Sequence, residues 1–431
     1  MDATCRVVIV GGGFGGLNAA KRLGHAPVSL TLIDRRNFHL FQPLLYQVAT
    51  GALSPGEIAS PLRAVVGRNK NTEVVLGEVR DLNAVNRRLI TDSGEIPYDE
   101  LIVATGVTHS YFGHDDWAKV APGLKTIENA TGIRSRLLAA FEQAERETDP
   151  VKRREWLNFV IVGGGPTGVE LAGALSEVAN DSLRHDFHHI DPTDAHILLV
   201  EGETRLLPAF PPELSAKAEE ELKQLGVHTR TATRVTAIDE GGVIMTGFHG
   251  SGGESAGGEE KLAARTVLWA AGVRASRMGK VLAERAGAQL DKVGRVMVQP
   301  DLTIEGYPEI RVIGDLANFS HQTGKPLPGV AQVAIQMGRY AAKAIRSKIE
   351  GKSLKPFRYF DKGNLATIGR NKAVADFGFL KISGFPAWFL WVFVHLMYLV
   401  EFENRLLVFV EWVYNYFTHN RGARLITKEN S

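Results

Sequence analysis

The sequence predicts an α/β fold with two Rossmann-like dinucleotide-binding domains, one inserted in the other, followed by a C-terminal helical segment that associates with a membrane. Three observations predict it. A strand, glycine turn and helix pattern occurs twice, a late apolar strand resumes the first domain, and the C-terminal region is strongly apolar. The 431 residues are enough for two or three domains, each with its own core.

The first copy of the pattern is Val7–Leu23, with the sequence VVIVGGGFGGLNAAKRL. β-Branched residues lead into a glycine turn and small helix-forming residues follow, as in a buried parallel strand that feeds a helix. Gly11 would make the tight turn, Gly13 would let the backbone approach a pyrophosphate, and Gly16 would let helix and strand pack closely. The next predicted strand ends in Asp34, so we expect that carboxylate to accept hydrogen bonds from a ribose.

The second copy is Phe159–Leu175, with the sequence FVIVGGGPTGVELAGAL and the glycines Gly163, Gly165 and Gly168. Its predicted ribose acid is Glu201, which follows an apolar strand after a polar insert. The chain therefore holds two dinucleotides, and a protein that holds two usually passes electrons between them.

Each glycine turn has a closing strand later in the chain. The first ends in Thr105 and Gly106 and the second at Gly272, and a small residue followed by glycine suits the close passage of a nucleotide. Another strand, Ile310–Leu316, resumes the first domain and makes the second nucleotide domain an insertion within it.

Two smaller features are also predicted. A short strand pair is expected around Glu73–Val79 and Arg88–Thr91. The glycine-rich segment Glu240–Lys261 is interpreted as the flexible tip of a hairpin, because no helix follows it as a phosphate loop would require.

Composition excludes several classes of function. A net charge of +2 gives no case for nucleic acid as a partner. Cys5 is the only cysteine, which excludes a redox-active thiol pair and fits a reducing compartment. A nucleotide strand that begins by Arg6 leaves no room for a secretory signal, so we expect the cytoplasmic side. The stretch HDFHHID (185–191) has metal-binding residue types but lies in the polar insert, and no metal is predicted.

These residues resemble the pyridine-nucleotide:flavin oxidoreductase superfamily over roughly residues 5–345. The resemblance implies that the first glycine turn binds FAD, that the inserted domain binds NAD(P)H, and that Asp315 of the Gly-Asp pair contacts the ribityl chain of FAD. The expected domains are a first FAD part at 1–117, an NADH domain at 118–275, a second FAD part at 276–345 and a quinone-pocket and membrane-anchoring region at 346–431.

Four further segments narrow the resemblance. FQPLLYQVATG (41–51), PLPGVAQVAIQMG (326–338), NLATIGRNKAVAD (364–376) and the aromatic C-terminus resemble type II NADH dehydrogenases, the single-subunit, non-pumping NADH:quinone oxidoreductases. With them the resemblance spans almost the whole chain.

The resemblance also implies site residues. Glu170 would reach the nicotinamide end of the cleft, although it could instead complement the helix dipole. Gln332 and Gln336 would line a quinone pocket under the flavin, unless they are polar helix residues that face solvent. Lys372 would exchange protons near the quinone head if burial lowers its pKa, and an exposed surface lysine is the alternative.

Two acids and an arginine bear on cofactor choice. Glu201 should repel a 2′-phosphate, and no arginine directly follows it, so NADH is expected as the substrate in preference to NADPH. Arg35 follows Asp34 and is expected to meet the FAD pyrophosphate or solvent.

The C-terminal residues predict a peripheral membrane protein. Ala387–Val400 is apolar but too short to span a bilayer, and Leu406–Phe417 is amphipathic. We expect two interfacial helices that bind the bilayer surface through residues 385–420, with Arg421, Arg424 and Lys428 on anionic lipid. The alternative is a helix pair that covers the core or forms a homodimer.

The expected function follows from the resemblance and the two cofactor sites. It is transfer of a hydride from NADH to FAD and of two electrons to a membrane quinone, ubiquinone or menaquinone, without proton pumping. The rival interpretations are a soluble NADH-dependent reductase of a protein electron carrier and a redox-sensing flavoprotein that binds a partner. The choice of quinone and the oligomeric state stay open.

Overall fold

A computed structural model describes residues 4–247, 258–418 and 421–427. By their internal contacts they form two compact units, each built from three stretches of chain. The first comprises residues 1–40, 59–108 and 273–362, and the second comprises residues 41–58, 109–272 and 363–431. The domain boundaries expected from sequence stay a prediction.

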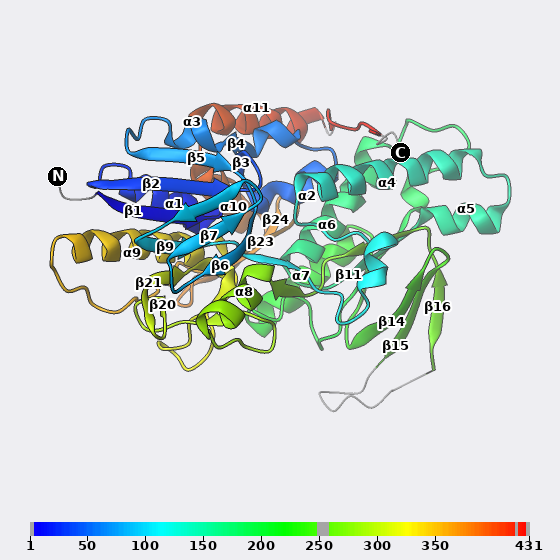
Figure 1. Ribbon diagram of the computed structural model, residues 1–431. Coiled ribbons are helices and arrows are strands. Elements are labelled where there is room, and N and C mark those ends of the chain that lie inside the picture. The colour runs from blue at the N-terminus through cyan, green and yellow to red at the C-terminus, as the bar shows by residue number, and fades with distance from the viewer. Residues whose placement is uncertain (1–3, 248–257, 419–420, 428–431) are drawn as a thin grey trace. The chain divides into compact units, whose positions relative to one another are not determined.

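The first unit is built on a six-stranded sheet (Figure 1). The strand order is β20 (Thr303–Ile304), β21 (Tyr307–Val312), β9 (Glu100–Val103), β1 (Cys5–Val10), β2 (Val28–Asp34) and β5 (Thr72–Leu76). Only β20 runs antiparallel to its neighbour. Because β21 pairs with β9 although the whole second nucleotide fold lies between them in sequence, the predicted insertion is confirmed.

Helices α1 (Phe14–Leu23) and α9 (Ala331–Ile349) of this unit pack against each other, with glycine at the contact. A Cβ on Gly338 would lie 2.1 Å from the Gly15 carbonyl oxygen, so the two helix backbones cross in contact. Their close packing fixes the helix that follows the first glycine turn. The unit also contains α3 (Leu62–Val66), α8 (Arg277–Ala286) and the pairs β3 (Phe38–Leu40) with β4 (Ala59–Pro61) and β19 (Val296–Met297) with β22 (Ala317–Asn318).

One strand pairing differs from the prediction. The segment 72–76 joins the main sheet beside β2, and a separate three-stranded antiparallel sheet contains β6 (Val79–Asn83), β7 (Arg88–Thr91) and β8 (Gly94–Pro97). The expected pairing of 73–79 with 88–91 is therefore wrong for residues 73–76 and holds only at Val79, which pairs with Thr91. Gly77 breaks the segment, so that the residues before and after it enter different sheets.

The second unit repeats the nucleotide fold with a parallel four-stranded sheet. Its order is β13 (Val227–Arg230), β12 (His196–Val200), β11 (Asn158–Val162) and β17 (Thr266–Trp269). The helices of this part are α4 (Ile127–Arg146), α5 (Pro150–Leu157), α6 (Pro166–Glu177) and α7 (Pro212–Gln224), and a π-helical turn, Val178–Ser182, continues α6.

An antiparallel sheet of β14 (Thr233–Asp239), β15 (Gly242–Gly247) and β16 (Glu260–Ala263) confirms the predicted hairpin. The tip is shorter than the expected 240–261, because residues 242–247 and 260–261 belong to β15 and β16, and residues 248–257 lie outside the described residues.

The C-terminal part of the second unit is a three-stranded antiparallel sheet and two helices. The strands are β23 (Asn364–Gly369), β24 (Lys372–Asp376) and β25 (Lys381–Ser383), and the helices are α10 (Phe385–Tyr398) and α11 (Phe402–Thr418). Both helices are confirmed close to the predicted bounds. In the described residues, neither these nor other helices combine the length and apolarity that a membrane crossing requires.

Candidate functional site

The first glycine turn has the geometry of a nucleotide cradle. Gly11 has a φ of +105°, and a Cβ there would lie 2.5 Å from the Ala104 carbonyl oxygen. A Cβ on Gly16 would lie 1.8 Å from the Gly11 oxygen, so both positions exclude a side chain by backbone packing. A Cβ on Gly13 would meet nothing within 4 Å. The open space at Gly13, at the start of α1, fits a pyrophosphate, as FAD requires.

Asp34 lies at the end of β2 and its carboxylate is bound to the same turn. It accepts hydrogen bonds from the backbone amides of Gly12 at 2.6 Å and Arg36 at 2.8 Å. Because a carboxylate has about four acceptor positions, capacity remains for ribose hydroxyls. The neighbouring Arg35 is exposed.

The other residues expected around FAD lie in the same unit. Thr105 shares a hydrogen bond of 2.6 Å with Ser276, and Gly106 has a φ of +64° just after β9. Asp315 lies in a single 3₁₀ turn after β21, where a Cβ on Gly329 would come within 3.5 Å of its carboxyl carbon. The carboxyl ends of β9 and β21 are neighbours in the sheet, so these residues gather at the edge that carries the glycine turn.

Gln332 and Gln336 lie near the start of α9 and bind one segment of chain. Gln336 donates to the Phe360 carbonyl at 2.8 Å and accepts from the Phe360 amide at 3.0 Å. Gln332 accepts from the Lys362 amide at 3.2 Å. The two amides therefore share a face, as their spacing predicted, and both side chains are half-buried.

The second glycine turn duplicates the first. Gly163 has a φ of +111°, and a Cβ on Gly168 would lie 1.8 Å from its oxygen, whereas Gly165 has open space. Glu201 accepts hydrogen bonds from the amides of Gly164 at 2.5 Å and Glu203 at 2.7 Å, as Asp34 does in the first turn. The residues therefore fit a second dinucleotide.

Gly272, after the closing strand β17, has a φ of +69°. A Cβ there would lie 2.5 Å from the ring of Phe112, whose own φ of +52° is unusual for an aromatic residue. The backbone conformation therefore favours glycine at 272, whereas the exposed Phe112 ring is free to move aside.

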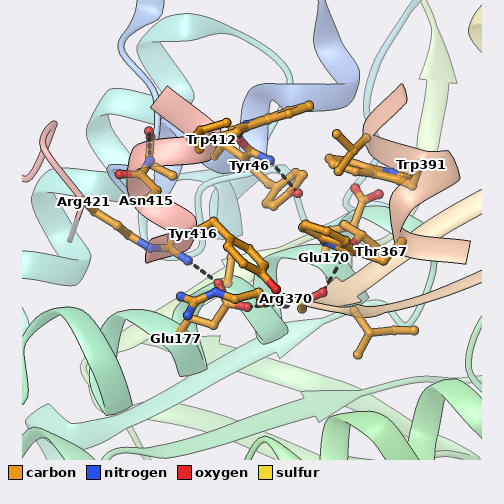
Figure 2. A pocket seen from close by; sticks show the side chains of 18 of the residues that line it. Tyr46, Glu170, Glu177, Thr367, Arg370, Trp391, Trp412, Asn415, Tyr416 and Arg421 are labelled. Carbon is orange, nitrogen blue, oxygen red and sulfur yellow. Dashed lines mark hydrogen bonds and ion pairs between the residues drawn. The ribbon is translucent and has the colours of Figure 1, made fainter. Parts of the chain in front are cut away.

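A cavity of about 370 Å³ lies within the second unit (Figure 2). Its wall is mainly aromatic and aliphatic, with a few polar groups among the apolar side chains. The segments that contribute are α2 (Leu45–Ala49), α6, β23, α10 and α11. Among the lining residues are Tyr46, Gln47, Glu170, Glu177, Thr367, Arg370, Trp388, Trp391, Trp412, Asn415, Tyr416 and Arg421.

Glu170 is the only one of the four predicted catalytic residues that lines this cavity. It lies in the second turn of α6, beyond the first turn, where a carboxylate best complements the helix dipole. Burial raises the pKa of its carboxyl group well above the ordinary value, and a hydrogen bond from the Thr367 backbone opposes this shift only in part. A neutral carboxylic acid is therefore favoured beside the cavity.

Lys372 does not line the cavity. It lies on β24, and its ammonium group donates to the Gln224 side chain of α7. Its predicted role near a quinone head stays a prediction, and this position does not support it. Gln332 and Gln336 lie in the other unit.

One prediction about the C-terminus is wrong. Arg421 does not lie free for lipid: it pairs with Glu177 at 2.7 Å and donates to the Thr50 hydroxyl at 2.7 Å, with only 9% of its side chain exposed. Arg424 pairs with Asp186 at 2.5 Å. Both arginines therefore attach the C-terminal segment to the protein, and Lys428 lies outside the described residues.

Sequence reasoning missed most of the cavity. Tyr46 and Gln47 belong to FQPLLYQVATG, which carried the family resemblance but no assigned role, and Trp391 and Trp412 were assigned to a membrane interface. The only feature of the sequence that could have indicated these cavity residues is the dense set of aromatic residues near the C-terminus, for which no core was evident. The HDFHHID stretch, in contrast, forms no metal-binding group among the described residues.

Comparison with known proteins agrees with this geometry. The family model described as pyridine nucleotide-disulphide oxidoreductase matches residues 5–338, and the model of the NDH2 C-terminal domain matches residues 362–420. The type II NADH:quinone oxidoreductase Ndh of Mycobacterium tuberculosis is 43% identical over 99% of this chain and 91% of its own length. The chain belongs to the type II NADH:quinone oxidoreductase family.

Other members of the type II family are also similar. NdhA of M. tuberculosis is 45% identical over 98% of this chain and 90% of its own length, and the Haemophilus influenzae enzyme is 32% identical over 86% of each. The structure of NDH2 from Plasmodium falciparum in complex with NADH superposes with a TM-score of 0.87 at 21% identity, and it covers 99% of this chain and 100% of that one. This structural likeness confirms the fold of the family.

Proposed function

We propose that this protein oxidises NADH with bound FAD and reduces a membrane quinone, without pumping protons. The observation that carries the proposal is the duplicated glycine turn, in which Gly13 and Gly165 each leave open space beside an acid bound to the turn. The aromatic cavity of the second unit supplies a place for an apolar acceptor. Membership of the type II family supports the same reaction.

The first turn would hold FAD and the second would hold NADH. When bound, FAD accepts a hydride and passes on two electrons. Gly11, Gly13 and Gly16 would cradle its pyrophosphate, Asp34 would accept from its ribose, and Asp315 would contact the ribityl chain. We place Thr105 and Gly106 along the nucleotide, whereas the exposed Arg35 would meet the pyrophosphate or solvent.

The nucleotide preference would come from Glu201. Its carboxylate is held by the amides of Gly164 and Glu203, where ribose hydroxyls can donate to it and a 2′-phosphate would meet a negative charge. Gly163, Gly165 and Gly168 would approach the pyrophosphate of NADH, and Gly272 would pass under it.

The quinone would enter the aromatic cavity. A flat, neutral ring with an isoprenoid tail suits a wall of tryptophan, tyrosine and phenylalanine, and this holds for ubiquinone and menaquinone alike. Quinone reduction consumes two protons, and Glu170, favoured in its neutral form beside the cavity, is suited to deliver one. We still propose that Gln332 and Gln336 line the side of the flavin that the quinone approaches.

We also propose that α10 and α11 bind the surface of a membrane at its cytoplasmic face. Exposed apolar side chains concentrate on these helices in numbers unusual for a protein surface. The most exposed among them include Phe385, Phe389, Phe393, Leu406, Val410, Tyr414 and Phe417. The absence of a redox-active thiol pair fits a reducing compartment.

Steady-state NADH oxidation tests the proposal. The purified protein should be yellow and should oxidise NADH with a short-chain quinone as acceptor, and added lipid should favour long-tailed quinones. A protein that reduced ferredoxin-like carriers but no quinone would refute the proposed acceptor and favour the soluble reductase instead.

A further inference from the structure

A chain of hydrogen bonds leads from helix α11 into the cavity. The Trp412 indole donates to the side-chain oxygen of Gln47 at 2.7 Å, and the side-chain nitrogen of Gln47 donates to the Tyr46 hydroxyl at 2.9 Å. Tyr46 and Gln47 are buried, and all three residues line the cavity. Figure 2 shows Tyr46 and Trp412 in its wall.

The direction of this chain is fixed by chemistry. An indole nitrogen can only donate a hydrogen bond, so the amide atom that faces Trp412 must be the oxygen. The amide nitrogen of Gln47 then faces Tyr46, and the Tyr46 oxygen is the acceptor. The hydroxyl proton of Tyr46 must therefore be directed away from Gln47.

Within the described ranges of the chain, no protein group accepts this proton. A buried hydroxyl without an acceptor is costly, so the site favours a ligand that brings one. Burial, with a smaller contribution from the nearby Glu170, raises the pKa of Tyr46 well above its ordinary value. The hydroxyl thus stays protonated at neutral pH and acts as a donor.

We propose that Tyr46 donates a hydrogen bond to one carbonyl oxygen of the quinone, and that Trp412 directs this donor through Gln47. Tyr46 is the residue that touches the substrate, while Gln47 and Trp412 are positioning residues. The inference rests on the proposed quinone reduction in this cavity. The bond strengthens as negative charge develops on the carbonyl oxygen during reduction, so it contributes mainly to the acceptor half-reaction.

The inference gives α11 a role in the reaction besides its proposed role at the membrane. Without the Trp412 donor, the Gln47 amide is free to rotate and present its oxygen to Tyr46. The Tyr46 hydroxyl would then donate to Gln47 and be withdrawn from the cavity. Loss of Trp412 and loss of the Tyr46 hydroxyl should therefore have the same effect on the quinone.

A double-mutant cycle tests this coupling. Tyr46→Phe and Trp412→Phe should each lower kcat/KM for a short-chain quinone by about tenfold, the effect of one hydrogen bond to a group that develops charge. The double variant should be no worse than either single variant, because both changes remove the same interaction. FAD content and anaerobic flavin reduction by NADH should match the unmodified protein in all three.

Trp388→Phe is the matched control, since Trp388 lines the same cavity but is not in the hydrogen-bond chain. Whatever factor Trp388→Phe alone takes from kcat/KM, the Tyr46 and Trp388 double variant should show the product of the two single losses. Two results would overturn this inference but not the proposed function. One is full quinone activity in Tyr46→Phe, and the other is a Tyr46 and Trp412 double variant whose loss of kcat/KM is the product of the two single losses. A protein that reduces ferricyanide with NADH but accepts no quinone would instead refute the proposed function beneath it.

Discussion

At Gly13 the protein fold has room for a side chain, but that room is the space that the FAD pyrophosphate would occupy. Its φ of −68° is open to any residue and its Cβ would meet nothing within 4 Å. We predict that Gly13→Val folds normally but binds no FAD, because the branched side chain occupies the pyrophosphate's space. Absorbance spectra after purification check this result.

Gly16→Val is the contrasting variant. A Cβ there would lie 1.8 Å from a backbone oxygen, so this change should destabilise the protein itself. Full flavin occupancy in Gly13→Val would show that the first turn does not bind FAD.

The charge on Glu201 is predicted to set nucleotide choice. Glu201→Gln should narrow the preference for NADH over NADPH, because it removes the negative charge that a 2′-phosphate would meet. The ratio of kcat/KM for the two nucleotides measures this. Glu240→Gln, which changes an exposed acid of the same unit, should leave the ratio unaltered. If the wild type, Glu201→Gln and Glu240→Gln all had the same ratio, the preference for NADH would be set by residues other than Glu201.

Glu170 predicts a pH dependence of stability. Because burial raises its folded pKa, the unfolded chain releases this proton at a lower pH than the folded protein does. The wild type should therefore lose stability relative to Glu170→Gln as pH rises above about 4.5, and the two should converge below that value. Denaturant unfolding at several pH values measures the difference. A gap that closed as pH rose would contradict a raised pKa.

At the scale of elements, the C-terminal segment is held to α6 by a buried ion pair. Arg421→Met would leave Glu177 largely buried without its cation, and should lower the free energy of unfolding by about 3 kcal/mol or more. Lys381→Met is the control, since it breaks a solvent-exposed pair with Glu213 and should cost little. Thermal and denaturant unfolding measure both changes. Equal losses of stability in Arg421→Met and Lys381→Met would show that the Arg421 pair stabilises no more than a surface pair.

Elements with a regular local pattern could be predicted from the sequence. β1, β2, β11 and β12 were expected at their observed places because apolar runs meet glycine or an acid. Helix α10 was expected from a continuous apolar run, and α11 from polar residues that recur at helical spacing among apolar ones. The partner of the strand at 72–76 could not be predicted, since its short pattern fits either sheet.

The candidate site could be predicted only where it is local. Each glycine turn and its acid lie within one strand, turn and helix unit, and the duplicated geometry follows from that unit alone. The cavity instead brings Tyr46, Glu170, Arg370 and Trp412 together from distant parts of the sequence. The sequence does not encode locally that Arg421 meets Glu177, so a basic tail was mistaken for a lipid contact.

At the scale of the whole molecule, the exposed apolar face of α10 and α11 predicts membrane binding. Changing Phe389 and Phe393, which are 61% and 56% exposed, to serine should lower binding to lipid vesicles by about tenfold or more, because less apolar surface is buried. Sedimentation with vesicles measures this. Val85→Ser, at an 82% exposed position outside these helices, is the control. Unchanged sedimentation of the double variant would refute the membrane assignment.

The central claim is that one chain takes electrons from NADH and delivers them to a quinone through one flavin. Anaerobic stopped-flow absorbance of the purified protein tests it most directly. We predict that NADH bleaches the flavin band in a first step, and that a short-chain quinone added afterwards restores it with formation of quinol. A flavin that NADH reduces but no quinone reoxidises would contradict the claim.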